Sequence, residues 1–422
     1  MSFATPARSR WSDVYLSASV TLVGATGAFL VMVTLVLGLQ ERGASGLQVA
    51  TLIIAESLPM VVLGRFMGRL VDRFDSRLLL VCAGVGQVVS CQLLVNADRF
   101  EWVVAGGVAL ATFSAVAGPT RSALLPAMVT RDDLPKASAI GQTASSIGLM
   151  AGPALAGFLV GAGDVRGTLQ IASFGFVATI VAGLLLKTRR GVASSKVDNA
   201  PPVDWKLSDD RMFRAVVWGM ALIVGAVSTV NVVAVFFIRG TLGSSATMYG
   251  LVDAVWTAGM LAGAWLCARV LRPATTDLAV VRWMFVSLGI ISVVVGAVGA
   301  VTAVLWIVPL YLVGGALNGG QNVIIGTLLG RRAPAAARGR AATALQSRVQ
   351  GGALLGYVAG GLVLEVVEPR WVFVGAGVLG LLAVLLVAPG IVSTHETSQS
   401  RAHPVPELPS PVLGTDAVGR TH

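Results

Sequence analysis

Charged residues are scarce in this sequence. Asp, Glu, Lys and Arg together make up 12% of the 422 residues, whereas hydrophobic residues make up 55%, and the mean hydropathy is +0.80. A soluble domain carries about 25% charged residues. The chain therefore has too little polar surface for a water-soluble globule. Because apolar runs of about 18 residues or more are long enough to cross a bilayer, we interpret it as a multi-pass membrane protein.

Histidine and cysteine are also scarce. His395, His403 and His422 all lie in the polar C-terminal tail, which excludes a histidine-based catalytic or metal centre among the membrane helices. The three cysteines lie inside apolar segments without metal-ligand or CxxC spacing, as expected of small packing residues. We therefore predict no metal site and no cofactor.

Two kinds of catalytic motif are missing as well. The sequence has no phosphate-binding loop of the form GxxxxGK[ST], so ATP is not the expected energy source. It also shows no nucleophile–base arrangement, and its polar loops are too short to house a catalytic domain. We predict that the protein is not an enzyme.

What the sequence does contain is a series of apolar segments. We predict an all-α membrane protein with twelve transmembrane helices in two pseudo-symmetric six-helix bundles, at 1–187 and 213–392. A cytoplasmic linker at 188–212 joins the bundles, and a disordered cytoplasmic tail follows at 393–422. The predicted helices span 12–39, 46–67, 77–97, 101–125, 137–161, 166–187, 213–238, 247–269, 278–300, 303–328, 341–365 and 370–392.

The net charge of +10 comes from arginines in short loops and not from a basic stripe, so we predict no nucleic-acid partner. With twelve helices and a cytoplasmic N-terminus, only 5 of the 31 Lys and Arg residues fall on the outer side. This asymmetry follows the positive-inside rule. It predicts cytoplasmic termini, and we expect a bacterial inner membrane protein.

Two segments about 200 residues apart resemble each other. One runs from Gly46 through Glu56, and the other runs from Ala246 through Asp253. Each is an apolar helix that carries one acid and leads to an arginine-bearing stretch. Duplicated membrane halves are typical of secondary transporters, whose substrate site lies between the repeats.

A charged loop motif is expected after the second helix, at Gly68, Asp72, Arg73 and Arg77. Asp72 is suited to face the positive N-terminal end of a neighbouring helix. The pattern resembles the G-x-x-x-D-R-x-G-R-R loop of the major facilitator superfamily, with Asp75 and Ser76 as departures. The resemblance implies the twelve-helix fold and a conformational latch in the outward-facing state.

Two further motifs resemble exporters of that superfamily. Gly148, Gly152, Pro153 and Gly157 in the fifth helix are similar to its antiporter motif, which favours efflux, although a generic small-residue packing face explains them too. The stretch from Gly118 through Arg121 to Pro126 is similar to a segment of macrolide and enterobactin exporters. Arg121 is either a gate residue or an interfacial anchor.

Two acids lie deep in apolar helices, at Glu56 and Asp253. A charged acid at mid-bilayer costs about 2.5–3.5 kcal/mol on insertion scales, so such residues are functional by default. We predict them as proton-coupling residues, with Asp13 in reserve; a neutral acid that is hydrogen-bonded inside the bundle is the alternative. Weaker candidates for a gate or for substrate contact are Arg348, Asn231, Asn318, Gln321 and Asn322.

Taken together, these features predict a monomeric secondary transporter that uses protons to export a small, fairly apolar compound such as a drug, natural product or siderophore. Uptake or facilitated diffusion of a metabolite is one alternative. A transport-inactive membrane sensor or assembly partner is another.

Overall fold

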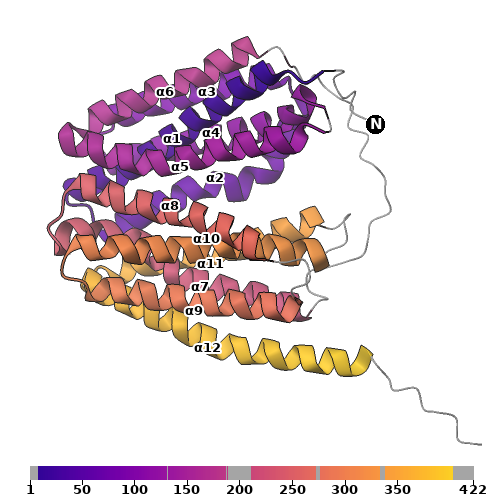
Figure 1. The fold of residues 1–422 in the computed structure, drawn as a ribbon. Coiled ribbons are helices and arrows are strands. Elements are labelled where there is room, and N and C mark those ends of the chain that lie inside the picture. The colour runs from indigo at the N-terminus through magenta and orange to yellow at the C-terminus, as the bar shows by residue number, and fades with distance from the viewer. Residues whose placement is uncertain are drawn as a thin grey trace, which may run out of the picture.

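The computed structural model describes residues 8–130, 132–186, 188, 211–271, 276–332 and 338–402. All regular structure in these ranges is helical, and twelve long α-helices run nearly parallel in two stacked bundles (Figure 1). The first bundle comprises α1 (Trp11–Glu41), α2 (Gly46–Arg73), α3 (Ser76–Val95), α4 (Phe100–Met128), α5 (Leu134–Ala162) and α6 (Val165–Leu185). The second comprises α7 (Arg211–Val235) with a π-helical end η1 (Phe236–Thr241), α8 (Ala246–Val270), α9 (Asp277–Ala300), a 3₁₀ turn η2 (Val304–Trp306), α10 (Ile307–Arg332), α11 (Arg338–Val363) and α12 (Pro369–Ala402).

The two bundles repeat one packing scheme. In the first, α1 packs on α5, α2 on α4, and α3 on α6; in the second, α7 packs on α11, α8 on α10, and α9 on α12. Between the bundles, α5 contacts α8, and the symmetry-related pair α11 and α2 are in contact as well. The predicted fold class, two pseudo-symmetric six-helix bundles, is therefore confirmed.

The helices are those of a membrane protein. Within the described residues, ten are apolar and long enough to cross a bilayer. Large apolar side chains such as Trp102, Phe158, Phe174 and Leu386 are exposed on the surface. The remaining two helices, α2 and α11, are less apolar, and they contact each other across the bundle boundary. Part of their surface therefore faces protein and not lipid.

Serine caps mark the start of α2 and of α8, which occupy equivalent places in the two bundles. The Ser45 hydroxyl caps α2 by accepting a hydrogen bond from the Gln48 backbone N–H at 3.4 Å. The Ser245 hydroxyl caps α8 in the same way, accepting from the Met248 backbone N–H at 3.2 Å. Such caps satisfy backbone donors that have no partner inside the helix. The two repeats noticed in the sequence thus begin at equivalent points.

Three predicted boundaries were wrong. The second helix was expected to end at 67, yet α2 continues to Arg73, so Gly68 and Asp72 belong to its last turns and not to a loop. No residue in this stretch interrupts the helix before Phe74, where the backbone becomes extended. Asp75 then caps α3, because its carboxylate accepts a hydrogen bond from the Arg77 backbone N–H at 2.7 Å.

The other two differences lie in the second bundle. α12 runs past the predicted end at 392 to Ala402, so the first part of the expected disordered tail is helical; no proline intervenes before Pro404. The seventh helix was expected to end at 238, but its last turns form the π-helix η1, which reaches Thr241. Residues 403–422 and most of the predicted linker lie outside the described residues.

Glycines allow close packing of α8 on α10. A Cβ at Gly263 would collide with the carbonyl oxygen of Ala316, and one at Gly319 would collide with that of Met260. Close approach of small residues is a main source of helix association in lipid. The α8–α10 pair therefore forms a rigid wall of the second bundle.

We expect Gly263→Ala to lower the thermal stability of the detergent-purified protein by several degrees, because α8 and α10 would have to separate; overpacking typically costs about 1–3 kcal/mol. The matched control is Gly375→Ala in α12, where a Cβ would meet nothing within 4 Å. Equal melting temperatures for the two variants, measured by fluorescence-detected size exclusion, would contradict the close-packing assignment.

Candidate functional site

Each bundle has a cavity whose described lining includes one acid. The first-bundle cavity measures about 520 Å³ and lies between α1, α2 and α4. The second-bundle cavity measures about 270 Å³ and lies between α7, α8, α9 and α10. The sequence-predicted acids Glu56 and Asp253 line the first and the second cavity, respectively.

Of the described residues that line the first-bundle cavity, Glu56 is the only one with an ionisable side chain. The other described lining residues are apolar apart from Ser57 and Ser114, and they include the aromatic Phe29. The Glu56 carboxyl packs against Gly107 of α4, where a Cβ would come within 2.8 Å of Oε1. In the part of the chain that the structure describes, this carboxyl has no hydrogen-bond or ion-pair partner. Gly107 thus makes room for an acid that protein groups do not neutralise.

Asp253 has more polar surroundings. The predicted residues Asn231, Asn318 and Gln321 line the same cavity, together with the aromatic side chain of Trp256. Sequence reasoning named Asp253 and the three amide side chains separately, and the structure brings them together.

The two acids are not at equivalent depths. Glu56 is ten residues from the start of α2, which is about 15 Å along the helix, whereas Asp253 is seven residues from the start of α8, or about 10 Å. The hydrocarbon core of a bilayer is about 30 Å thick. Glu56 therefore lies about 5 Å farther along its helix than Asp253 does.

Asp13 has a different environment. Its carboxylate is 4% exposed and accepts hydrogen bonds from the Thr188 backbone N–H at 3.0 Å and from the Thr188 hydroxyl at 2.6 Å. These bonds tie the beginning of α1 to the chain that leaves α6. This is the arrangement of a structural anchor, and it places the reserve proton candidate outside both cavities.

Several predicted polar residues do not line either cavity. Asn322 is exposed and donates to the Asn318 carbonyl oxygen of its own helix at 3.3 Å. Arg348 donates to the Ala344 carbonyl oxygen one turn earlier in α11, at 3.0 Å. Arg121 reaches across to α1, where its guanidinium nitrogens lie 3.8–4.0 Å from the Cβ position of Gly24. It therefore points toward a neighbouring helix of its own bundle.

The fifth-helix glycines serve two different neighbours. Gly148 and Gly152 pack on α1, since a Cβ at Gly152 would lie 2.6 Å from the Cβ of Phe29. Gly157, one turn past Pro153, packs on α8 of the other bundle, since a Cβ at Gly157 would lie 2.9 Å from the Cα of Gly250. The motif therefore joins α5 both to its own bundle and to the opposite one.

Sequence reasoning missed several residues of the second cavity, including Tyr249, Tyr311 and Ser228. Tyr249 could have been found, because it precedes Asp253 by four residues and so shares its face of α8. Tyr311 carried no such signal, because its position depends on how α10 packs against α8.

Comparisons with known proteins agree with this architecture. The family model described as Major Facilitator Superfamily matches residues 17–271 and 216–420. The chain belongs to the major facilitator superfamily.

The relatives named next are similar in sequence or fold only. The uncharacterized MFS-type transporter YfiS of Bacillus subtilis (strain 168) is 24% identical over 391 residues, covering 89% of this chain and 92% of that protein. The crystal structure of a mutant of the nucleoside transporter NupG has a TM-score of 0.72 at 12% identity, covering 89% of this chain and 99% of that one. A bacterial homologue of the human lysosomal transporter Spinster, in an inward-facing and unoccupied conformation, has a TM-score of 0.65 at 14% identity, covering 92% and 97%.

The two bundles of this superfamily member are in contact at the end of the molecule where α1 ends and α2 begins. We call the contacts between the bundles at this end the seam. Arg239 of η1 forms an ion pair with Glu41 at the end of α1, at 2.7 Å, and Glu365 accepts from the Leu47 backbone N–H at the start of α2, at 3.3 Å. Thr247 donates to the Gly157 carbonyl oxygen at 3.3 Å. All three contacts join one bundle to the other.

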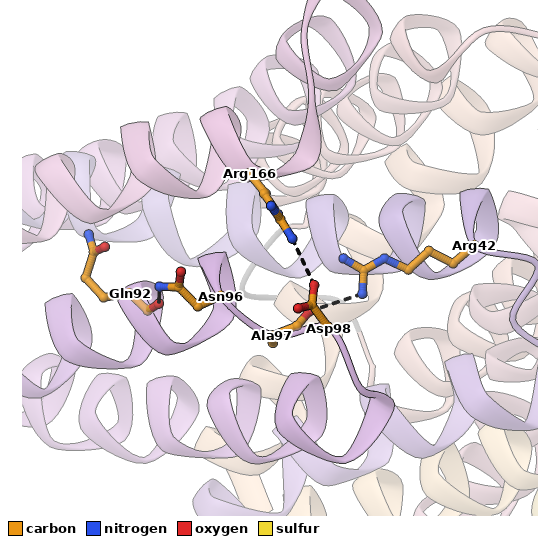
Figure 2. Close-up of polar contacts among 6 residues, drawn as sticks. All are labelled: Arg42, Gln92, Asn96, Ala97, Asp98 and Arg166. Carbon is orange, nitrogen blue, oxygen red and sulfur yellow. Dashed lines mark hydrogen bonds and ion pairs between the residues drawn. The ribbon is translucent and has the colours of Figure 1, made fainter.

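Loop contacts hold the first-bundle side of the seam in place. Arg42 donates to the Ala97 carbonyl oxygen at 3.2 Å, and Arg166 pairs with Asp98 at 2.8 Å (Figure 2). Both members of the Arg166–Asp98 pair are mostly exposed, so their contribution to stability is small. Their effect is to bring the ends of α1, α3 and α6 together beside Glu41.

The superfamily-type motif at the end of α2 lies toward the opposite end of the molecule. Arg73 is exposed, while Arg77 donates to the Leu184 carbonyl oxygen near the end of α6, at 2.7 Å. The Asp72 side chain lies outside the described residues. Arg77 therefore links α3 to α6 within one bundle.

The ion pair across the seam gives a prediction. We expect Arg239→Glu to open the seam more often, because it places two acids side by side, and the charge-swapped double variant with Glu41→Arg to restore closure. Half-exposed ion pairs are worth up to about 1 kcal/mol, so loss of the pair alone raises the opening by up to about fivefold, and repulsion between the two acids adds to this. The readout is maleimide labelling of Ala246→Cys, a buried position at the start of α8, in nanodiscs and in a background without Cys82, Cys91 and Cys267.

Arg269→Glu is the control, because Arg269 is exposed in the last turn of α8, at the other end of this helix from the seam. Unchanged labelling in Arg239→Glu, or no recovery in the swapped variant, would show that the pair does not hold the seam.

Proposed function

We propose that this protein exports a small, largely apolar compound in exchange for protons by alternating access, in a bacterial inner membrane and as a monomer. The observation that carries the proposal is Glu56, an ionisable group without a described partner that lines an otherwise apolar cavity. A charged carboxylate is heavily penalised there. Reversible protonation of Glu56 is therefore coupled to whether the cavity is open to water.

The packing between the bundles supports alternating access. The seam joins them at one end, through single polar contacts and glycine contacts that can separate without breaking either bundle. If the termini are cytoplasmic, this is the inward-open state. Opening the seam while the other ends approach then exposes Glu56 to the opposite side, where it takes up a proton that it later releases inside.

The choice of an exporter rests on the sequence motifs. The segment from Gly118 to Pro126 and the fifth-helix glycines resemble exporters of the macrolide and enterobactin type. The contact of Gly157 with α8 adds a physical reason, because it lets one helix seal the boundary between the bundles.

We expect Glu56→Gln to insert and fold normally but to lose transport driven by a pH gradient, because the amide cannot exchange a proton. A drug-sensitive host expressing the chain is screened for reduced accumulation of a macrolide, a catecholate siderophore and a lipophilic dye, with and without a protonophore. Any compound that is exported is then measured in proteoliposomes under an imposed pH gradient.

The matched control is Glu101→Gln, an exposed acid in the first turn of α4. Gradient-driven export by Glu56→Gln equal to that of the Glu101→Gln control would remove Glu56 from the coupling mechanism. Movement of the compound into the cell would instead identify an uptake system.

We also propose that Gly68, Asp72 and Arg73 form the latch that acts when the seam is open. Asp72→Asn removes an anion that is favoured beside a helix N-terminus by about 0.3–1 kcal/mol. We expect a well-expressed Asp72→Asn protein that transports several times more slowly than wild type, measured in the same vesicles. Wild-type flux would rule out the latch.

A further inference from the structure

The second-bundle cavity is chemically unlike the first. Among the described residues, Asp253 is the only acid or base that lines it. The Asp253 carboxyl has no side-chain hydrogen-bond or ion-pair partner in that part of the chain. Around it lie the neutral polar groups of Ser228, Asn231, Asn318 and Gln321. The cavity thus presents one unpartnered carboxyl and several side chains that can accept as well as donate hydrogen bonds.

Aromatic rings complete the wall beside this carboxyl. Trp256 follows Asp253 by three residues and so lies on the same side of α8. Its ring meets that of Tyr311 edge-on, with the centroids 5.4 Å apart. Gly314 makes room for the indole, since a Cβ there would lie 2.7 Å from the Trp256 ring. The rings are therefore held in place by the close packing of α8 on α10.

One of the polar groups is held in place as well. Gln321 is 3% exposed, and its side-chain nitrogen donates to the Ser287 hydroxyl at 3.2 Å, which leaves its carbonyl oxygen as an acceptor. A site whose rings and acceptor are already in position loses little conformational freedom when it binds a ligand.

We propose that this cavity binds the cationic head of the substrate, a protonated amine or a quaternary ammonium group, with Asp253 as its counter-ion. A carboxylate beside aromatic ring faces is the arrangement that recognises ammonium groups, by charge pairing together with cation–π attraction. A cavity of about 270 Å³ suits the head of a molecule and not a whole drug-sized compound, for which pockets typically reach about 300–1,000 Å³. The substrate class is therefore an amphipathic cation whose apolar part lies outside this cavity.

This inference rests on the proposed transport function, and it assigns a different role to each of the two acids. Asp253 binds the substrate, and Glu56 carries the proton. The assignment fits their surroundings, because Asp253 is next to acceptors and rings whereas Glu56 is next to apolar side chains. The alternative occupant is a neutral ligand held by hydrogen bonds. Binding of such a ligand would not depend on a positive charge on the ligand.

A matched pair of probes tests the proposal. Benzyltrimethylammonium and neopentylbenzene have the same shape, but only the first carries a charge. We expect radiolabelled benzyltrimethylammonium to bind the full-length protein in nanodiscs and to resist competition by neopentylbenzene. Asp253→Asn should weaken its binding by about 10- to 100-fold, the range for loss of a charged partner. Asp253→Glu should retain binding within a few-fold.

Two controls complete the design. Asp98→Asn and Glu101→Gln each remove an exposed acid of the first bundle that lines neither cavity, and both variants should bind the cation as wild type does. Equal affinity for the two probes, or undiminished binding by a folded Asp253→Asn protein, would overturn the proposal. If Asp253→Asn fails to fold, the probe preference of the wild type and the Asp253→Glu result still decide it.

This measurement is made at equilibrium, without a pH gradient. Cation binding without gradient-driven export would therefore reject the proposed function while the site assignment stands. Export of panel compounds without any cation preference would reject the site assignment and leave the proposed function intact.

Discussion

The hydrocarbon interior of the bilayer is the constraint on which this structure depends. It offers no hydrogen-bond partners, so every spanning segment must satisfy its own backbone, and the chain forms helices throughout its described span. It also removes the hydrophobic drive for one helix to associate with another. Association then depends on close contact, which explains why glycines meet backbone atoms at the main helix crossings, including α8 on α10 and α7 on α11.

The same constraint gives meaning to the few buried charges. In water, Glu56 and Asp253 would be ordinary surface acids, but in the membrane each requires a compensating group or a functional reason. The described structure provides no protein partner for either carboxyl and places each on a cavity wall. A charge that the protein does not satisfy is available to a proton or a cationic ligand, and the different linings of the two cavities suggest which acid takes which.

The strength of the contacts also differs within the molecule. Inside each bundle, helices are joined along much of their length, and their ends are fastened by bonds such as Asp13 to Thr188. Between bundles, the polar contacts described at the seam are single and partly exposed, as in the Glu41–Arg239 pair. Exposed pairs of this kind are weak. The seam also includes the close packing of α5 on α8 through Gly157 and Gly250, so opening it has to separate these two helices. Because its polar contacts are weak, the two bundles can rock against each other while each keeps its own packing.

The amino-acid sequence by itself determined the membrane class, the helices and their duplication, because apolar length and charge scarcity are properties of segments and do not depend on packing. It also pointed to Glu56 and Asp253, since an acid in an apolar run is visible without coordinates. The sequence was less informative about helix ends. Both α2 and α12 continue past their predicted limits, because polar residues that follow an apolar run do not by themselves end a helix.

Only the tertiary structure decided which residues share a site. Asn231, Asn318 and Gln321 come from helices far apart in the chain, and Tyr311 joins them through the packing of α10 on α8. Tertiary packing also separated Asp13 and Asn322 from the cavities, and divided the fifth-helix glycines between α1 and α8. Spacing along one helix defines a face, but the partner of that face is set by how twelve helices fit together, and that fit is a property of the whole chain.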